Sequence, residues 1–328
     1  MTALAREPGP GAARLASVVI GALVAAGWLM AAASAAALAG SLWWVLDLVA
    51  SFRPQIAVVM LLPLGVVALL RPLRRLSAAV LTLATLVNAA VLWPYLAGPP
   101  PRAEGAAVLD VISYNVGISS AGRDRAMSWV KAQDPDVVFL YESSFEWEDS
   151  IARVGIALDV VAEVPPGRLA GITVLAKPGL GARVVDSPFD PAQSVAIRLD
   201  PGGGSIDVLG LHPPSPTTPQ RAERRDALLA GAGDWVAGRS VPVLVVGDLN
   251  ATPWSHARRA LVRRGGLTDS LEGRGLQPTW PAGWGPLMIP IDHALTGPGL
   301  VVTRRGTGPE LGSSHLPLLV SVAYQDGG

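Results

Sequence analysis

The N-terminal third of this chain is dominated by runs of residues without charge. Leu15–Leu46 contains no Asp, Glu, Lys or Arg, and two further uncharged runs follow at Pro54–Leu70 and Leu76–Pro101. A helix needs about 20 apolar residues to cross a bilayer. Buried core helices are the weaker interpretation, because soluble helices rarely stay apolar on every side over such lengths. We predict a cytoplasmic tail at residues 1–14 and a membrane region of three transmembrane helices at residues 15–97.

The charges that flank these runs predict an orientation. Arg6 and Arg14 precede the first run, and the second and third runs are separated by Arg71, Arg74 and Arg75. Positively charged loops tend to stay in the cytoplasm. The N-terminus is therefore expected inside the cell, and three spans place the rest of the chain outside the cell membrane.

Two alternatives to this topology stay open. The first run resembles a signal peptide, with Arg14 as its basic flank and the small residues of Ala31–Ala39 as a cleavage site. Removal of this signal peptide would leave two spans, and the C-terminal part would still lie outside the cell membrane. Pro54–Leu70 is the shortest run, and if it were re-entrant the C-terminal part would lie in the cytoplasm.

Charge divides the chain into two unlike parts. Seven of the 26 Lys and Arg but only two of the 26 Asp and Glu lie before Ala103, which leaves a formal charge of −5 after Arg102. This balance disfavours nucleic acid as a partner, since non-specific binding of phosphates favours a basic face. The chain has no cysteine, which excludes disulfides, thiolate metal sites and cysteine nucleophiles.

The pattern changes after GPPPR, Gly98–Arg102, which has the composition of a stiff linker; we place the linker at residues 98–106 and a globular domain at residues 107–328. Apolar, β-branched runs alternate there with helical segments, which favours a two-sheet α/β sandwich over a simple parallel sheet. Strands are expected at Val108–Tyr114, Val137–Tyr141, Ile172–Ala176, Val195–Leu199, Ile206–Leu211, Val241–Val246, Ile291–Leu295, Leu300–Thr303 and Leu318–Ala323, and helices at Arg123–Gln133, Gln220–Val236 and His256–Arg264.

Unusual polar residues lie inside or at the end of five of these strands. One more lies shortly before a sixth strand. Taken singly, each has an ordinary explanation: Asp248 and Asn250, for example, suit an Asx turn. Asp292 is harder to explain in this way, because a carboxylate inside an apolar strand needs a partner. The repetition favours a functional site made of Asn115, Glu142, His212, Asp248, Asn250, Asp292 and His315.

The same residues carry a family resemblance. The ordered motifs are YNVG (Tyr114–Gly117), LYES (Leu140–Ser143), LHPPSP (Leu211–Pro216), GDLNATPWS (Gly247–Ser255), IDHAL (Ile291–Leu295) and SSHLPLLV (Ser313–Val320). Together they resemble the endonuclease/exonuclease/phosphatase superfamily, the fold of DNase-I-like nucleases, inositol polyphosphate phosphatases and bacterial sphingomyelinases. The resemblance covers roughly Ala107–Ala323 and implies a two-sheet, four-layer α/β sandwich.

The membrane region, ATPWS and the PTWP of Pro278–Pro281 are similar to a membrane-tethered bacterial subgroup. That subgroup includes the vancomycin- and teicoplanin-resistance-associated membrane proteins, which are thought to act on lipid-linked pyrophosphate at the outer face. The resemblance therefore implies a lipid-linked phosphate or pyrophosphate ester as substrate.

The resemblance implies a role for each site residue. The residues with an implied catalytic role are His212, Asp248, Asn250, Asp292 and His315. Those implied to bind the substrate are Asn115, His212 and Asn250, and those implied to bind the metal are Glu142, Asn115 and Asp248. The implied cofactor is Mg²⁺, with Mn²⁺ as an alternative, because a hard cation prefers carboxylate oxygens. The chemistry is in-line attack of water on phosphorus.

One position departs from the family pattern. The last motif usually reads Ser-Asp-His, but here Ser314 replaces the carboxylate, so we expect one metal ion rather than two. The first hypothesis is a membrane-anchored, Mg²⁺-dependent phosphohydrolase outside the cytoplasm. The alternatives are an extracellular nuclease or phospholipid phosphodiesterase, and a catalytically impaired membrane scaffold.

Two further features bear on the substrate. The apolar loop Trp280–Ile289 either anchors at a membrane interface, where Trp is common, or packs on the core. Clusters of arginine are expected to be solvated helix surface rather than phosphate clamps; they are Arg221/Arg224/Arg225 and Arg258/Arg259/Arg263/Arg264. The sequence does not indicate an oligomeric state.

Overall fold

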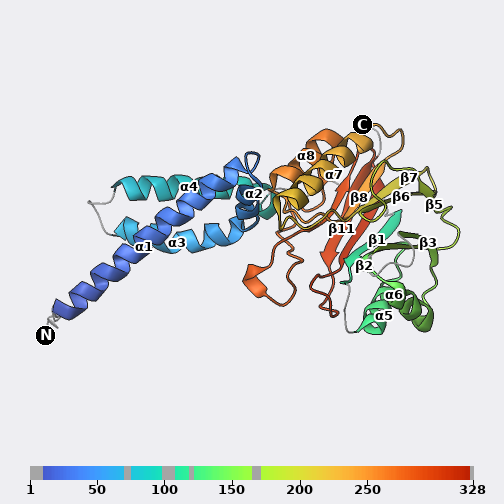
Figure 1. The fold of residues 1–328 in the computed structure, drawn as a ribbon, viewed down its shortest axis with the longest axis horizontal. Coiled ribbons are helices and arrows are strands. Elements are labelled where there is room, and N and C mark those ends of the chain that lie inside the picture. Colours follow the sequence, from blue (N-terminus) through green and yellow to red (C-terminus); the bar gives the residue numbers. More distant parts are fainter. Residues whose placement is uncertain (1–9, 70–74, 98–107, 118–121, 165–170, 326–328) are drawn as a thin grey trace. The chain divides into compact units, whose positions relative to one another are not determined.

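Two compact units make up the chain. The computed structural model describes residues 10–69, 75–97, 108–117, 122–164 and 171–325, and divides into Met1–Leu92 and Trp93–Gly328 (Figure 1). The predicted linker at residues 98–106 lies outside the described residues.

Apolar helices form the first unit. They are α1 (Pro10–Ala36), the short η1 (Ala37–Ala39), α2 (Trp44–Ser51), α3 (Arg53–Leu69) and α4 (Arg75–Leu96). Two helices, Arg14–Ala39 and Arg75–Leu96, are long and apolar enough to cross a membrane. The pair α2 and α3 is bent by 67° at its break, and it counts as a third span only if both helices are taken together. The described helices therefore allow two or three of the predicted spans.

A buried polar contact joins three of these helices. Arg53 Nη1 donates to Asn88 Oδ1 at 2.9 Å, and Asn88 Nδ2 donates to Ser34 Oγ at 2.8 Å. All three side chains are buried. Polar groups in apolar surroundings need such partners, so this contact links α1, α3 and α4 in a defined arrangement.

The second unit is built on two mixed six-stranded sheets. The first has the order β11-β12-β1-β2-β4-β3 and the second the order β5-β6-β7-β8-β10-β9. Among the described strands, only β1–β2 and β7–β8 pair in parallel. The strands are β1 (Leu109–Asn115), β2 (Val137–Ser143), β3 (Asp159–Val164), β4 (Gly171–Ala176), β5 (Arg183–Val185), β6 (Ser194–Leu199), β7 (Ile206–Leu211), β8 (Val243–Asp248), β9 (Thr268–Asp269), β10 (Asp292–Thr296), β11 (Leu300–Thr307) and β12 (Leu318–Tyr324).

Helices cover the outer faces of both sheets, as Figure 1 shows. One pair, α5 (Arg123–Gln133) and α6 (Phe145–Val154), packs on the first sheet, and α7 (Pro219–Ala237) and α8 (His256–Gly265) pack on the second. A third apolar cluster lies between the sheets and includes Phe139, Val208 and Val246. This four-layer α/β sandwich confirms the predicted fold class.

Local sequence explains the start of the longest helix in this unit. Thr218 caps α7, its side chain accepting a hydrogen bond from Arg221 N at 3.3 Å, and Pro219 occupies the first turn. Both features are favoured at helix N-termini. They fix where the chain turns from the His212 loop into α7.

Several elements were not predicted. They are α6, β3, β5 and β9. The expectation of solvated arginine clusters was wrong at two positions, because Arg225 and Arg258 are buried, at 1% and 2% exposure. Arg258 pairs with the buried Asp269 at 2.5 Å. The other five members of the two clusters are exposed.

Candidate active site

The strand topology brings the predicted site residues to one edge of the sandwich. Asn115 and Asp248 are the last residues of β1 and β8, Glu142 lies next to the end of β2, and His212 directly follows β7. Carboxyl ends of parallel neighbours lie at the same edge of a sheet. β10 and β12 run antiparallel to β8 and β1, so they begin at this edge and bring Asp292 and His315 to it.

Asn115 connects the acidic residues of the site. Its Nδ2 donates at 3.0 Å to Glu142 Oε1 and at 3.0 Å to Asp248 Oδ2, and lies 3.5 Å from His212 Nε2. Its Oδ1 accepts a hydrogen bond from Gly117 N at 3.1 Å, which fixes the orientation of the amide. In this arrangement Asn115 orients two carboxylates as a donor, and direct metal coordination by Asn115 stays a prediction.

His212 lies at the open side of this cluster. Its Nε2 is 3.4 Å from Glu142 Oε1 and 3.7 Å from Asp248 Oδ2, and its side chain is 19% exposed. Together with the Asn115 amide, His212 lowers the pKa of Glu142 to about 2. Glu142 is therefore ionised over the physiological range. A pocket of about 200 Å³ opens beside both side chains, lined by Glu142, Gly171, Ala192, Gln193, His212 and Pro214.

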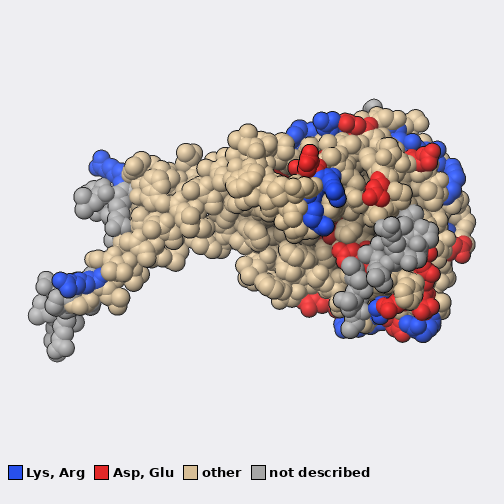
Figure 2. All heavy atoms as spheres, viewed as in Figure 1, with Lys and Arg blue, Asp and Glu red and all other residues tan. Residues whose placement is uncertain are grey.

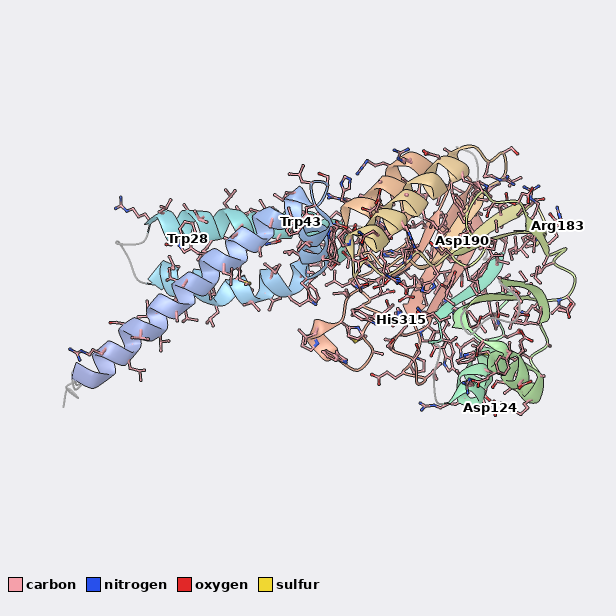
Figure 3. All side chains as sticks on the ribbon, in the orientation of Figure 1. Trp28, Trp43, Asp124, Arg183, Asp190 and His315 are labelled. Carbon is pink, nitrogen blue, oxygen red and sulfur yellow. The ribbon has the colours of Figure 1, made fainter. Side chains whose placement is uncertain are left out.

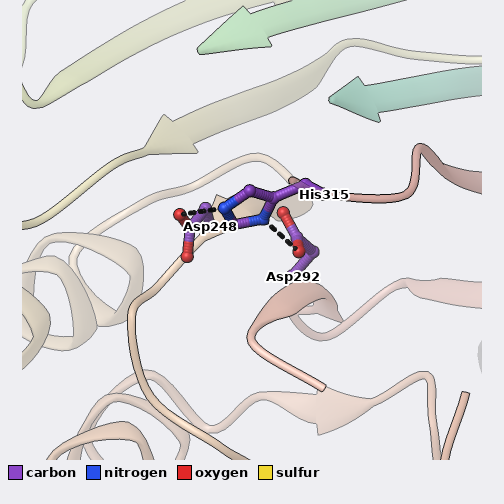
Figure 4. Close-up of side chains that lie close together, drawn as sticks. All are labelled: Asp248, Asp292 and His315. Atoms are coloured by element: carbon purple, nitrogen blue, oxygen red, sulfur yellow. Dashed lines mark hydrogen bonds and ion pairs between the residues drawn. The ribbon is translucent and has the colours of Figure 1, made fainter. Parts of the chain in front are cut away.

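His315 lies between two buried carboxylates (Figure 4). Its Nδ1 is 3.0 Å from Asp292 Oδ2 and its Nε2 is 3.6 Å from Asp248 Oδ2. Asp248 and Asp292 are directly opposite each other in the β8–β10 pairing. Like charges in such a pair repel, so a cationic ring between them relieves a repulsion that the register itself creates.

The protonation states in this trio follow from burial and charge. Burial acts against a charged ring, but Asp292 and Asp248 raise the pKa of His315 to about 9. Burial would also raise the pKa of Asp292, but the His315 charge and hydrogen bond outweigh it and lower this pKa. For Asp248 burial prevails and raises the pKa. Asp248 is thus the more basic carboxylate.

Asn250 stands in a strained loop directly after β8. Its φ is +48°, in the left-handed region that non-glycine residues rarely adopt. The loop is held by its own groups, since Asn250 N donates to Asp248 Oδ1 at 2.9 Å and Asn250 Nδ2 donates to Pro213 O at 3.0 Å. Glu142 also has a positive φ, of +57°. Strain of this kind concentrates at functional sites.

Two buried residues that were not predicted hold this loop from behind. Arg225 Nη1 donates to Asn250 O at 3.1 Å, and His293 Nε2 lies 2.7 Å from Ala251 O. Burial lowers the pKa of His293 to about 3, so the ring is neutral and Nε2 must carry the proton. A signal for Arg225 was present in the sequence, because it lies between Ala222 and Leu228 at helical spacing on the buried face of α7.

The segment before β12 is fixed to β1. Ser313 Oγ donates to Asn115 O at 2.7 Å and accepts from His315 N at 3.1 Å. The neighbouring Ser314 is exposed, and its carbonyl accepts from Ala282 N at 2.8 Å. Position 314 therefore offers no carboxylate and faces solvent.

The oxygen donors of the site fit a divalent cation. Asp248, Asp292 and His315 have ligand atoms within 4.8 Å of one another. A protonated His315 has no free lone pair, however, and both of its nitrogens face carboxylates. Glu142 is ionised and 30% exposed toward the pocket, so Glu142 and Asp248 are the more suitable pair for a hard cation.

The fold and this geometry agree with one protein family. Residues 112–315 match the Endonuclease/Exonuclease/phosphatase family, which is more than half of the chain. The chain therefore belongs to this family, whose members are typically metal-dependent phosphoesterases or nucleases. No protein of curated function matches the chain.

Solved structures share the fold at low identity. Humanized D. rerio TDP2 is 16% identical with a TM-score of 0.54, over 66% of this chain and 98% of that chain. The mannosyl-6-phosphatase of Bacteroides thetaiotaomicron is 18% identical with a TM-score of 0.52, over 66% and 100%. A functionally unknown conserved protein from Enterococcus faecalis is 16% identical with a TM-score of 0.53, over 66% and 100%. At these identities the likeness establishes the fold alone.

Proposed function

We propose that this protein is a membrane-anchored, divalent-metal-dependent phosphohydrolase that acts outside the cytoplasm on a lipid-linked phosphate or pyrophosphate ester. One observation carries the proposal: acidic, amide and imidazole groups from separate strand ends converge, with Asn115 Nδ2 3.0 Å from both Glu142 and Asp248 and His315 Nε2 3.6 Å from Asp248. Family membership supports hydrolysis of a phosphate ester.

The side chains divide the chemistry among them. Asp248 orients the attacking water and accepts its proton. The cationic His315, oriented by Asp292, supplies positive charge and an N–H next to Asp248 as negative charge develops on the phosphoryl oxygens. His212 offers a further N–H at the open side.

Asn250 has one amide hydrogen in use and a second available. Its Nδ2 donates to Pro213 O, and a carboxamide nitrogen has two hydrogens. The second can donate to a phosphoryl oxygen. Because the backbone of Asn250 is held in the left-handed region, this donor is positioned before the substrate binds.

Glu142 and Asp248 would hold the cation, with Asn115 orienting both carboxylates. When bound, Mg²⁺ or Mn²⁺ supplies charge stabilisation at the phosphoryl oxygens and helps to orient the ester. We propose one ion, since position 314 offers no carboxylate for a second.

Charge and membrane-length helices support a lipid-linked substrate. Among the described residues, the lining of the pocket beside Glu142 includes no Lys or Arg. Figure 2 shows basic and acidic side chains interspersed over the visible face of the second unit, without a continuous basic stripe. A nucleic-acid substrate would favour such a stripe. The apolar helices of the first unit would keep the enzyme at a bilayer.

A panel of phosphate esters tests this proposal. The full chain in detergent is offered a polyprenyl pyrophosphate, a phospholipid, a soluble phosphomonoester and plasmid DNA, each with Mg²⁺ and with EDTA. We expect phosphate release from the polyprenyl substrate with Mg²⁺ only, and a higher Mg²⁺ requirement in Glu142→Gln because the cation loses a charged ligand.

The other hypotheses are distinct outcomes of the same panel. Cleavage of DNA that weakens steeply with salt would identify a nuclease. Release of a phosphorylated head group would identify a phospholipid phosphodiesterase. Failure on every ester, with no Mg²⁺ binding by calorimetry in the folded protein, would indicate a scaffold.

A further inference from the structure

One exposed apolar surface lies beside the active site. The run Trp280–Ile291 contains no charged residue. At its tip Trp284 is 63% exposed and Leu287 is 51% exposed, in and beside the short helix η2 (Gly285–Leu287). Exposing Trp and Leu to water is unfavourable, and a contiguous apolar patch on a surface commonly marks a binding site. We name residues 280–289 the Trp loop.

The Trp loop has a defined shape. Trp280 and Ile289 exchange backbone hydrogen bonds at its base, with N–O distances of 3.1 and 2.5 Å. Within the tip, Leu287 N donates to Trp284 O at 3.2 Å and Met288 N to Gly285 O at 3.1 Å. The exposure of Trp284 and Leu287 is therefore a feature of an ordered turn with its own hydrogen bonds.

The loop is attached to the segment that carries His315. Ala282 N donates to Ser314 O at 2.8 Å, and Leu316 N donates to Thr279 O at 2.9 Å. The Trp280 ring lies 6.4 Å from the His315 ring, centre to centre. The base of the loop thus lies next to a side chain that we propose to act on the phosphate.

We infer that the Trp loop inserts into the interface of a lipid bilayer and presents a lipid-borne phosphate to His315. The composition fits this occupant, because Trp and Leu favour the boundary between head groups and acyl chains. The inference deepens the proposed function and rests on its membrane anchoring, since the apolar helices of this chain would keep a bilayer within reach.

A carboxylate beside the tip argues for apolar insertion rather than binding to anionic head groups. The Glu310 carboxylate lies beside Gly283 in the tip, and no Lys or Arg occurs within the loop. Binding through the apolar side chains is therefore expected to be insensitive to ionic strength, unlike attraction between basic residues and anionic lipids.

Site-specific labelling tests this inference without any measurement of activity. The chain has no cysteine, so Trp284→Cys gives a single site for an environment-sensitive fluorophore on the full chain in proteoliposomes. Val184→Cys is the matched control, because Val184 is an exposed apolar residue, 55% exposed, on β5. Its neighbour Arg183 lies at the edge of the unit away from His315 (Figure 3).

We expect doxyl lipids labelled near the head groups to quench the label at position 284 by about half or more, because interfacial side chains lie about 5–10 Å into this boundary. The label at position 184 should keep its emission, and the quenching should be equal at about 0.05 and 0.5 M salt. Leu287→Cys provides a second report if Trp284→Cys does not fold.

Equal emission of both labels with and without doxyl lipid would overturn the inference. A blue shift at position 284 without quenching would also overturn it, because the loop would then be covered by protein. The proposed hydrolysis can fail on the ester panel while quenching persists, so failures of the two proposals are distinguishable.

Discussion

At the scale of single residues, the ion pair between His315 and Asp292 determines how the site responds to pH. Asp292 and Asp248 raise the pKa of His315 to about 9, so the ring stays charged through neutral pH. A basic group whose pKa is higher in the folded than in the unfolded state stabilises the fold. For His315 this stabilisation is fully present below the ordinary histidine pKa of 6.5. That stability is lost as the pH rises through about 9.

Asp292→Asn should shift the basic limb of the pH–rate profile toward lower pH. The amide oxygen can still accept from His315 Nδ1, but the negative charge that favours the imidazolium is gone. The variant should lose more activity at pH values between the ordinary pKa of His315 and about 9 than at lower pH. kcat/KM measured against pH in both proteins checks this, and an unmoved basic limb would exclude His315 as the group that titrates.

Much of the residue-level site could be predicted from the sequence. Asp248 is the last residue of β8 and His315 lies shortly before β12, and strands are visible as apolar runs. The contacts that hold the site could not be predicted in this way. Arg225 is 25 positions from Asn250, and His293 is 42 positions from Ala251, so no local pattern relates either pair. The register that places Asp292 opposite Asp248 is likewise a long-range property.

At the scale of elements, α7 supports the loop that follows β8. Arg225 on its buried face reaches Asn250 O at 3.1 Å and also donates through Nε to Asp226 Oδ1 at 2.7 Å. The contact joins the helix after β7 to the loop after β8. This hydrogen bond therefore supports the loop in which Asn250 has a positive φ.

Arg225→Met should lower kcat by about a hundredfold with little change in KM, because misplacing a positioned group by about 1 Å costs this much. It should also destabilise the fold by about 1–3 kcal/mol, since a partly buried carbonyl loses its donor. Arg225→Lys should recover part of kcat, because one donor can still reach the carbonyl.

The control is Arg224→Met, which removes an exposed arginine from the same helix. Steady-state kinetics and thermal unfolding of all three variants separate the two effects. If Arg225→Met and Arg224→Met had equal kcat, Arg225 would have no part in positioning Asn250.

Two of the elements that prediction missed, β5 and β9, share a physical cause. β5 is three residues long, with two of them exposed, and β9 has two residues. Such short edge strands exist only through pairing with a neighbour, here β6 and β10. Strands such as β8 are buried on both faces and are recognisable from their apolar residues alone.

At the scale of the whole molecule, the number of spans would decide on which side of a membrane the proposed site lies. The bend of 67° between α2 and α3 is compatible with a broken span or with a re-entrant loop. The basic run Arg71–Arg75 in the sequence favours three spans, because it is expected to stay in the cytoplasm.

Cysteine accessibility should place the second unit outside the cell. Ser240 is exposed, and the natural chain has no cysteine that would react. In intact cells, Ser240→Cys should react with a membrane-impermeant maleimide, whereas Arg75→Cys should react only after lysis. Protection of position 240 until lysis would show that α2 and α3 do not cross the membrane together.

The central claim is that the convergent strand ends form a hydrolytic site with Asp248 as the base. The most direct test is the initial rate of phosphate release by the full chain with Mg²⁺, on the best substrate of the panel. Asp248→Ala is compared with Asp186→Ala, which removes an exposed carboxylate. We predict a loss of about 10²–10⁴-fold for Asp248→Ala and an unchanged rate for Asp186→Ala. A wild-type rate in Asp248→Ala would contradict the account.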